Sequence, residues 1–210
     1  MTGHRGGLLY RPWNLLYNGA MRSYRPVNLN TLWFLIALNL VIFVITLLRP
    51  LEVISALGLT PAELPERPWA MVSAMFVHGG LTHILFNMIG LYFLGSFLIR
   101  AVGERSFLAV FFLGGLAGNV LFAVLAPPQA TGIGASGAVY ALGGALAVMV
   151  PKVPVLVFPI PMPIPLWIAI ILFLLLSFLP GIAWQAHLGG LFLGLMAGFI
   201  FRKRRRMYYV

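Results

Sequence analysis

The chain has 210 residues, of which 61% are hydrophobic and only 9% are charged, and its mean hydropathy is +0.98. A water-soluble domain of this composition would lack the polar side chains needed to cover its surface, so the sequence predicts a polytopic membrane protein. The net charge of +10 does not indicate nucleic-acid binding, because the basic residues flank apolar segments, and the lack of cysteine excludes disulfides, cysteine nucleophiles and thiolate metal sites.

The first 30 residues form a basic and aromatic tail. They contain four arginines but no continuous apolar run, so no cleavable signal peptide is predicted, and the first apolar segment is expected to act as its own signal. Tyr10, Trp13 and Tyr17 lie among these arginines. This mixture is typical of a segment that rests on anionic lipid.

Six apolar segments follow that could cross a bilayer. Each is expected to be helical, because backbone groups in lipid must be satisfied within the segment. They comprise residues 31–48, 82–99, 106–125, 136–150, 166–180 and 184–201. The sequence thus predicts an all-α bundle of six transmembrane helices, residues 31–201, followed by a basic tail, residues 202–210.

The distribution of lysine and arginine predicts the orientation. With six spans, twelve of these residues fall on one side of the membrane, against only Arg49 and Arg67 on the other. Because positive charge concentrates in cytoplasmic segments, both termini are expected to be cytoplasmic. The loop of residues 49–81 is then outside, and it is too long for a simple connector, so we expect it to fold against the membrane interface.

Polar side chains recur at one depth in the second, fourth and sixth spans. His83 and Asn87, Ser136 and Tyr140, and His187 all lie in the first turns of helices that descend from the outer face. A spacing of four residues places His83 with Asn87, and Ser136 with Tyr140, on one helix face. We therefore expect the five side chains to converge.

The fourth span is short. Its 15 residues would rise about 22 Å, against a hydrocarbon core of about 30 Å, so its Ser136 end should lie below the outer surface. Residues 127–133 must then fill the missing depth. Irregular backbone is tolerated there only inside protein or beside water, which hydrolysis requires.

Ser136 and His187 form the candidate catalytic pair. A serine hydroxyl is a weak nucleophile until a base removes its proton, and imidazole is the usual base near neutral pH. The chain has no aspartate, and its four glutamates lie in loops, so the histidine must be oriented by packing or by a neutral partner. Tyr140, one turn after the serine, is the predicted partner, and the pattern predicts a Ser/His dyad.

Donors for a developing oxyanion are available nearby. His83, Asn87 and the backbone N–H of Ser136 at a helix N-terminus are the predicted set. Gly134 and Gly137 would permit a close approach of the reacting group. The histidines have no acidic or thiolate companions, so neither a metal nor another cofactor is predicted.

Several of these features would individually favour a structural interpretation. A Gly-x-Ser-Gly sequence in a membrane helix is more typical of close helix packing than of catalysis. A single intramembrane Asn or His is more typical of interhelical hydrogen bonding. Only the combination of these residues favours catalysis. His78 is expected to be structural or interfacial, and Asn39 and Asn119 to make buried polar contacts. Helix-packing glycines are predicted in the sixth span, against glycines of the fourth: Gly190, Gly194 and Gly198 against Gly137, Gly143 or Gly144.

Residues 151–165 contain six prolines and are expected to form a cytoplasmic connector that lies along the membrane. The fifth span that follows has few small residues. Weak packing of this span would suit a movable lateral gate.

Three motifs carry a resemblance to a known family: His78 with His83-Ile84-Leu85-Phe86-Asn87, Gly134-Ala135-Ser136-Gly137-Ala138-Val139-Tyr140, and Ala186-His187 followed by Gly190 and Gly194. In order and spacing they resemble rhomboid intramembrane serine proteases. The resemblance implies a six-helix core with Ser136 as nucleophile and His187 as base. It further implies an oxyanion hole that includes His83 and Asn87, and Tyr140 stacked on the imidazole. Two positions depart from the family pattern: Ala70 follows Trp69 where Trp-Arg is usual, and Ile99 stands where glutamate is frequent.

The predicted function is hydrolysis of peptide bonds in or near transmembrane segments, and the resemblance implies substrates with single spans cut near their outer ends. Transport is disfavoured, because the intramembrane ionisable residues lie in the outer third rather than near the midplane. A catalytically inactive rhomboid-like protein that binds transmembrane helices is the alternative. The expected location is a prokaryotic cell membrane, with the site opening to the outer side, in preference to the mitochondrial inner membrane.

Overall fold

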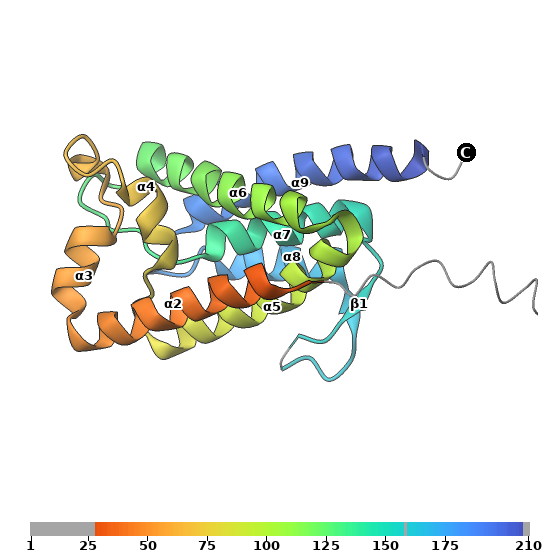
Figure 1. The fold of residues 1–210 in the computed structure, drawn as a ribbon, viewed down its shortest axis with the longest axis horizontal. Helices are drawn as coiled ribbons and strands as arrows, with labels where there is room; N and C mark the ends of the chain where they lie inside the picture. Colours follow the sequence, from red (N-terminus) through yellow and green to blue (C-terminus); the bar gives the residue numbers. More distant parts are fainter. Residues whose placement is uncertain (1–27, 158, 208–210) are drawn as a thin grey trace, which may run out of the picture.

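The computed structural model describes residues 28–157 and 159–207 as a bundle of helices (Figure 1). The basic residues at the start of the N-tail and the last residues of the C-tail lie outside this description, and so does the predicted contact of the N-tail with lipid. Four helices are long and apolar enough to cross a membrane: α2 (Asn30–Leu48), α5 (Leu81–Val102), α6 (Glu104–Leu125) and α9 (Trp184–Met207), the last through its segment Trp184–Arg202. The prediction of a helical membrane protein is thus confirmed for the described part of the chain.

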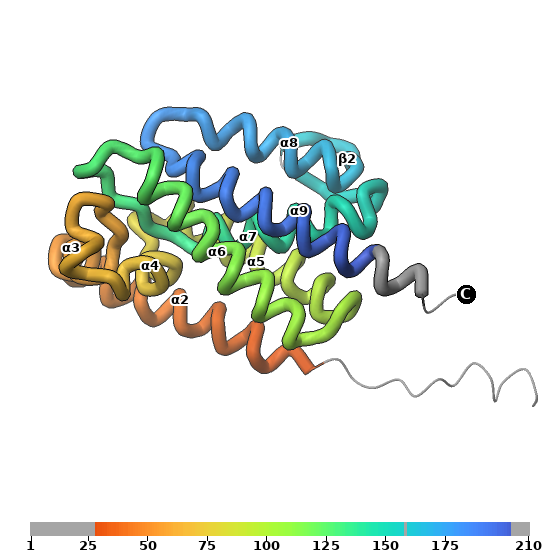
Figure 2. Tube along the Cα trace, turned by 90° about the horizontal axis from the view of Figure 1, so that it is seen from above, coloured from red at the N-terminus to blue at the C-terminus, as the bar shows by residue number. Residues whose placement is uncertain are grey.

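Two shorter apolar helices complete the bundle, α7 (Ser136–Met149) and α8 (Leu166–Leu176). Helix α7 lies at the centre, with most of its residues buried against α5, α6 and α9. In the view of Figure 2, α8 runs along one edge of the bundle and α2 along the opposite edge. A short helix rich in small residues therefore forms the core around which the longer helices pack.

Small residues bring α7 and α9 into contact. A Cβ placed on Gly190 would lie 1.9 Å from the Gly137 carbonyl oxygen, and one on Gly194 would lie 2.1 Å from the Ala141 carbonyl oxygen. The predicted packing of the α9 glycines on the fourth span is therefore observed, but their partners differ in part. Gly143 lies instead against Ile170 of α8, on another face of the helix.

Helix α8 is shorter than predicted. The expected span of residues 166–180 ends as a helix at Leu176, because the chain tightens into turns after Ser177 and Pro180 cannot continue the helix. The Ser177 N–H bonds to the carbonyls of both Phe173 and Leu174, which is typical of a helix end that narrows toward a 3₁₀ turn. Gly181 then adopts a φ of +82°, and α9 begins at Trp184.

The loop before α5 is folded; its predicted contact with the membrane interface stays a prediction. It contains α3 (Pro50–Leu57), η1 (Pro61–Glu63), α4 (Ala70–Ser73) and η2 (Ala74–Phe76), at the end of the molecule opposite to the end of α9 (Figure 1). Leu59 and Gly132 exchange both backbone hydrogen bonds, at 3.0 and 2.8 Å, which join this loop to the segment between α6 and α7. Trp69 donates from Nε1 to the Ala56 carbonyl oxygen at 2.9 Å, so the tryptophan is anchored although alanine follows it.

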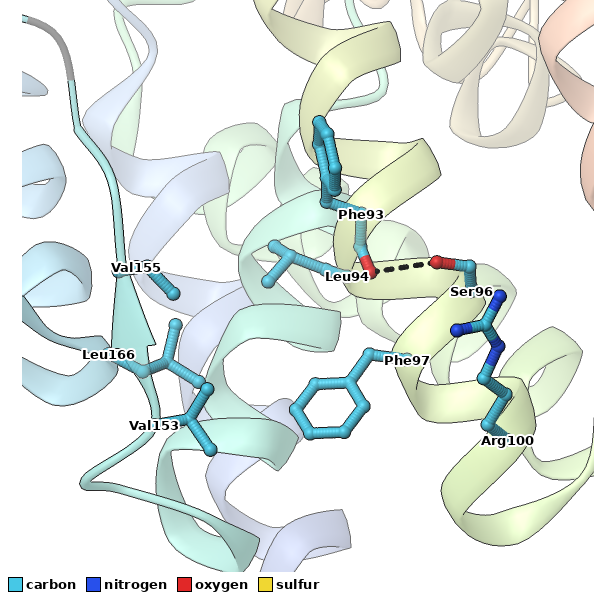
Figure 3. A pocket seen from close by; sticks show the side chains of 8 residues that line it. All are labelled: Phe93, Leu94, Ser96, Phe97, Arg100, Val153, Val155 and Leu166. Atoms are coloured by element: carbon cyan, nitrogen blue, oxygen red, sulfur yellow. Dashed lines mark hydrogen bonds between the residues drawn. The ribbon is translucent and has the colours of Figure 1, made fainter. Parts of the chain in front are cut away.

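The proline-rich connector contains the one pair of β-strands among the described residues, which are otherwise mainly α-helical. Strands β1 (Pro154–Val155) and β2 (Ile164–Pro165) pair in antiparallel register. Between this connector and α5 lies a cavity of about 260 Å³. Figure 3 shows Leu94 and Phe97 pointing from α5 toward Val153 and Leu166 across it. The cavity thus separates α5 from the connector and from the first residue of α8.

Candidate active site

Ser136 is the first residue of α7, and the loop before it is tightly held. Gly134 has a φ of +117°, a conformation that side chains other than glycine rarely adopt, and its N–H bonds to the Ala74 carbonyl oxygen at 2.8 Å. The N–H of Ala135 points at His78 Nε2, 3.4 Å away. No side chain caps this start of α7, so the N–H groups of its first turn have no acceptor within the helix.

His187 lies directly beside the serine. Its Nε2 is 2.7 Å from Ser136 Oγ, and the side chain is buried in the first turns of α9. The close contact of α7 with α9 at Gly137 and Gly190 sets this distance. Helix α6 also approaches, because a Cβ on Gly118 would lie 2.5 Å from the carbonyl oxygen of Ala186. Three helices thus fix the position of the imidazole.

The partner of the second imidazole nitrogen differs from the sequence-based expectation. Tyr140 stacks on the His187 ring, with centroids 4.4 Å apart and an interplanar angle of 24°. The group that contacts Nδ1, however, is Ser177 Oγ at 2.7 Å, and the Tyr140 hydroxyl lies 2.9 Å from the same oxygen. Both neighbours of the imidazole are neutral, as predicted. Tyr140 stacks on the ring, and Ser177 hydrogen-bonds to Nδ1.

Ser177 is the functional candidate that the sequence analysis missed. Its side chain is 2% exposed and it follows the last residue of α8. A signal was present, because Ser177 carries the only hydroxyl between residues 166 and 180 in a segment that is otherwise apolar. Buried hydroxyls in apolar surroundings need partners, and these partners are the site residues.

His83 and Asn87 lie in the first two turns of α5, and His83 borders the loop that precedes Ser136. A Cβ on Gly134 would lie 2.6 Å from His83 Nε2, so only a residue without a side chain leaves room for this ring. Asn87 donates from Nδ2 to the His83 carbonyl oxygen at 2.8 Å, while its buried Oδ1 has no partner within the described residues. The second Nδ2 hydrogen of Asn87 has no acceptor within the described residues. Gly137 lies against α9, so of the two predicted glycines only Gly134 borders His83.

Carboxylates make their contacts away from this cluster. Glu52 pairs with Arg49 and Glu63 with Arg67 in the loop before α5, and Glu104 accepts a hydrogen bond from Thr31. Among residues 28–157 and 159–207, no group of three or more His, Cys, Asp or Glu side chains is placed to hold a metal ion. The cluster can therefore move a proton between serine and histidine, and only neutral groups touch the imidazole.

His78 supports the loop from outside the spans. Its side chain is fully buried between η2 and α5, and its ring meets that of His83 edge-on, with centroids 5.0 Å apart. Burial, with a smaller contribution from His83, lowers the pKa of His78 to about 3. The neutral ring can thus accept the Ala135 N–H, which is the structural role expected for it.

This low pKa predicts a pH-dependent stability. Below pH 6.5 the unfolded chain protonates at His78 while the folded protein does not, so the free energy of unfolding should fall as the pH drops from 6.5 toward 3. The expected slope from this residue is on the order of 1 kcal/mol per pH unit. Thermal unfolding in detergent at several pH values measures it. His78→Gln, which keeps an acceptor but does not titrate, should show a shallower slope; an unchanged slope would contradict the assignment.

Comparisons with known proteins agree with this architecture. The family model of the rhomboid domain matches residues 65–204. RHOMBOID-like protein 5 of Arabidopsis thaliana is 30% identical over 144 residues, which are 68% of this chain and 47% of that protein. The putative rhomboid protease YdcA of Bacillus subtilis (strain 168) is 34% identical over 82 residues, 39% of this chain and 41% of that protein.

Rhomboid protein 1, mitochondrial, of Saccharomyces cerevisiae is 25% identical over 154 residues, 64% of this chain and 42% of that protein. The chain thus spans less than half the length of these three relatives. The matched domain contains α5 to α8, most of α9 and every residue of the Ser136–His187 cluster. Since this match covers well over half of the chain, the protein belongs to the rhomboid family and is an integral membrane protein.

Proposed function

We propose that the protein is an intramembrane serine endopeptidase that cleaves peptide bonds in or near transmembrane segments. The observation that carries this proposal is the 2.7 Å contact between Ser136 Oγ and His187 Nε2 within an apolar helix bundle. A structural serine in such a bundle can satisfy its hydroxyl on a backbone carbonyl of its own helix, as Ser96 does with Phe93. Ser136 instead meets a base, the arrangement that activates a nucleophile.

The chemistry follows from these two side chains. His187 Nε2 accepts the proton of Ser136 as Oγ attacks the amide carbonyl, and then returns it to the leaving amine. Water takes the place of the amine in the second half of the cycle and releases the acyl group from Ser136. Stacking on Tyr140 restrains the imidazole during both transfers.

The oxyanion that forms on the carbonyl requires donors. The backbone N–H of Ser136, His83 and one Nδ2 hydrogen of Asn87 are the proposed set, and such donors contribute about 3 kcal/mol each in related sites. The uncapped start of α7 supports this role, because its free N–H groups and helix dipole favour negative charge. The tight Gly134 loop keeps the His83 ring close to this helix end.

We further propose that α7 and α8 complete six spans, with both termini in the cytoplasm and the site opening to the outer side. Helix α2 begins and α9 ends at the same end of the bundle, whereas α3 and α4 lie at the other (Figure 1). Among the described residues, Arg100, Arg105, Lys152 and Arg202 fall at helix ends on the side where α2 begins and α9 ends, whereas Arg49 and Arg67 fall beside α3 and α4. The favoured location is a prokaryotic cell membrane, with the mitochondrial inner membrane as the alternative.

Substrates are proposed to be membrane proteins whose transmembrane segment enters between α5 and α8. The cavity in Figure 3 lies between α5 and the connector that leads into α8, and its lining is apolar except for Ser96 and Arg100. A substrate helix needs such an apolar path, because its own surface faces lipid before it binds. No cofactor takes part in the proposed reaction.

A fluorophosphonate probe in detergent tests the proposal. The expected result is covalent labelling at Ser136, lost in Ser136→Ala and strongly reduced in His187→Ala. Ser55→Ala is the matched control: Ser55 is exposed and accessible, but its hydroxyl bonds only to the Glu52 carbonyl oxygen, so its removal should not change labelling. Folded protein that labels nowhere and leaves a single-span substrate intact would support the inactive helix-binding alternative instead.

A further inference from the structure

The hydroxyl of Ser177 makes more contacts than it has protons. Its Oγ lies 3.0 Å from the Phe173 carbonyl oxygen, 2.7 Å from His187 Nδ1 and 2.9 Å from the Tyr140 hydroxyl. A serine hydroxyl donates one hydrogen bond and accepts two. The Phe173 carbonyl can only accept, so the single Ser177 proton satisfies that contact when it points there.

The other two groups must then be donors. Tyr140 donates its phenolic proton to Ser177 Oγ, and His187 donates a proton from Nδ1. An imidazole that carries its proton on Nδ1 has a free lone pair on Nε2, and Nε2 is the atom that faces Ser136 Oγ at 2.7 Å. With this assignment all four contacts, from Phe173 and Tyr140 to Ser177, from Ser177 to His187 and from His187 to Ser136, are hydrogen bonds.

The opposite assignment leaves contacts unmade. If Ser177 donated to Nδ1, the Phe173 carbonyl oxygen would face Ser177 Oγ at 3.0 Å without a proton between them. His187 would then carry its proton on Nε2 and could not accept one from Ser136. The first assignment makes four hydrogen bonds and the second makes three, while the Phe173 carbonyl oxygen accepts the Ser177 N–H at 3.1 Å in both.

We propose that Ser177 is a positioning residue that holds His187 in the tautomer with its proton on Nδ1, so that Nε2 is ready to act as the base. This inference rests on the proposed protease function and extends it from a dyad to a network of neutral hydroxyls. Ser177 never touches the reacting atoms. It takes the place that a carboxylate occupies in soluble serine proteases, and a neutral group there avoids burying a second charge in the bundle.

Ser177 joins the end of α8 to both α7 and α9. Its backbone N–H bonds to the last turn of α8, while its side chain bonds to α7 through Tyr140 and to α9 through His187. Alignment of the base therefore depends on the end of α8 remaining packed on both helices. Removal of the hydroxyl should act on the base and not on the affinity for substrate.

The first test reads the tautomer directly. Protein labelled with ¹⁵N-histidine in detergent micelles is observed by long-range ¹H–¹⁵N correlation, and the His187 signals are assigned by their loss in His187→Gln. The expected spectrum shows the Nδ1–H tautomer in the wild type and a mixture in Ser177→Ala. An Nε2–H tautomer in the wild type, or an unchanged spectrum in Ser177→Ala, would overturn the proposal.

The second test separates orientation from substrate binding. In Ser177→Ala, kcat for a single-span substrate and the rate of fluorophosphonate labelling should both fall about 10- to 100-fold, as for a lost hydrogen bond to a group that becomes charged, while KM stays within about twofold. Ser177→Thr keeps the hydroxyl and should recover the tautomer and most of kcat. A change in KM alone would overturn the positioning role.

Thr46→Val is the matched control, because Thr46 is another buried hydroxyl that bonds a carbonyl four residues earlier but lies far from this network in α2. Its kcat should equal that of the wild type. The two tests also separate the two proposals: wild-type protein that cleaves nothing would refute the protease function, yet its His187 spectrum would still decide whether Ser177 fixes the tautomer.

Discussion

Ser136→Ala and His187→Ala are each expected to lower kcat for a single-span substrate by about 10³-fold or more, and the double variant should be no slower than the slower single variant. The physical reason is that the two side chains act as one unit: without the base the hydroxyl is a poor nucleophile, and without the hydroxyl the base has no proton to accept. The measurement is cleavage of a fluorescent single-span substrate in proteoliposomes, with thermal unfolding of each variant as the control for folding.

Two outcomes would contradict this prediction. Multiplicative losses in the double variant would show that the residues act independently, so their 2.7 Å contact would not be a catalytic pair. Retention of activity in Ser136→Ala would assign the nucleophile to another group. Ser136→Ala should lose little stability, because water can replace its one polar contact at this half-buried position. His187→Ala removes two hydrogen bonds and the stacking on Tyr140 at a buried position, so it should be the less stable of the two variants.

Gly190→Ala is expected to reduce both activity and stability. The new Cβ would lie 1.9 Å from the Gly137 carbonyl oxygen, a backbone atom that cannot rotate away, so α9 must move off α7. A shift of about 1 Å between catalytic groups costs about 10²-fold in rate, and overpacking of this kind typically costs about 1–3 kcal/mol. Cleavage and thermal unfolding measured on the same preparation give both quantities.

Gly80→Ala is the matched control for this substitution. A Cβ on Gly80 meets nothing within 4 Å, and the φ of −177° is extended backbone that alanine adopts readily. Its unfolding temperature and kcat should therefore remain close to those of the wild type. If Gly190→Ala behaved in the same way, the contact of α7 with α9 would not set the distance between Ser136 and His187.

The local features of the site were accessible from the sequence. Hydropathy and length located all six apolar helices, and four-residue spacing placed Ser136 and Tyr140 on one helix face. Residue chemistry singled out Ser136 and His187, and the structure brings them within hydrogen-bonding distance. Residue types and helical periodicity carry this information because both act over a few neighbouring residues.

Contacts between helices were predicted less well. Tyr140 stacks on His187 as expected, but the hydrogen bond to Nδ1 comes from Ser177 at the end of α8, which was not predicted. Gly143 faces α8 and not the glycines of α9. In a soluble helix, polarity indicates which face is exposed. Helix α8 is apolar on every side, because lipid and the protein interior are equally apolar, so its sequence does not indicate which face is buried.

The amino-acid sequence alone thus established a helical membrane protein, the approximate limits of its long helices, and a serine and a histidine suited to acid–base chemistry. The rotation of each helix about its axis, the early end of α8 and the network from Phe173 to Ser136 emerged only once the helices were packed. The reason is physical: hydrophobic periodicity is a local property of the chain, whereas a hydrogen bond between Ser177 and His187 depends on how α7, α8 and α9 pack together.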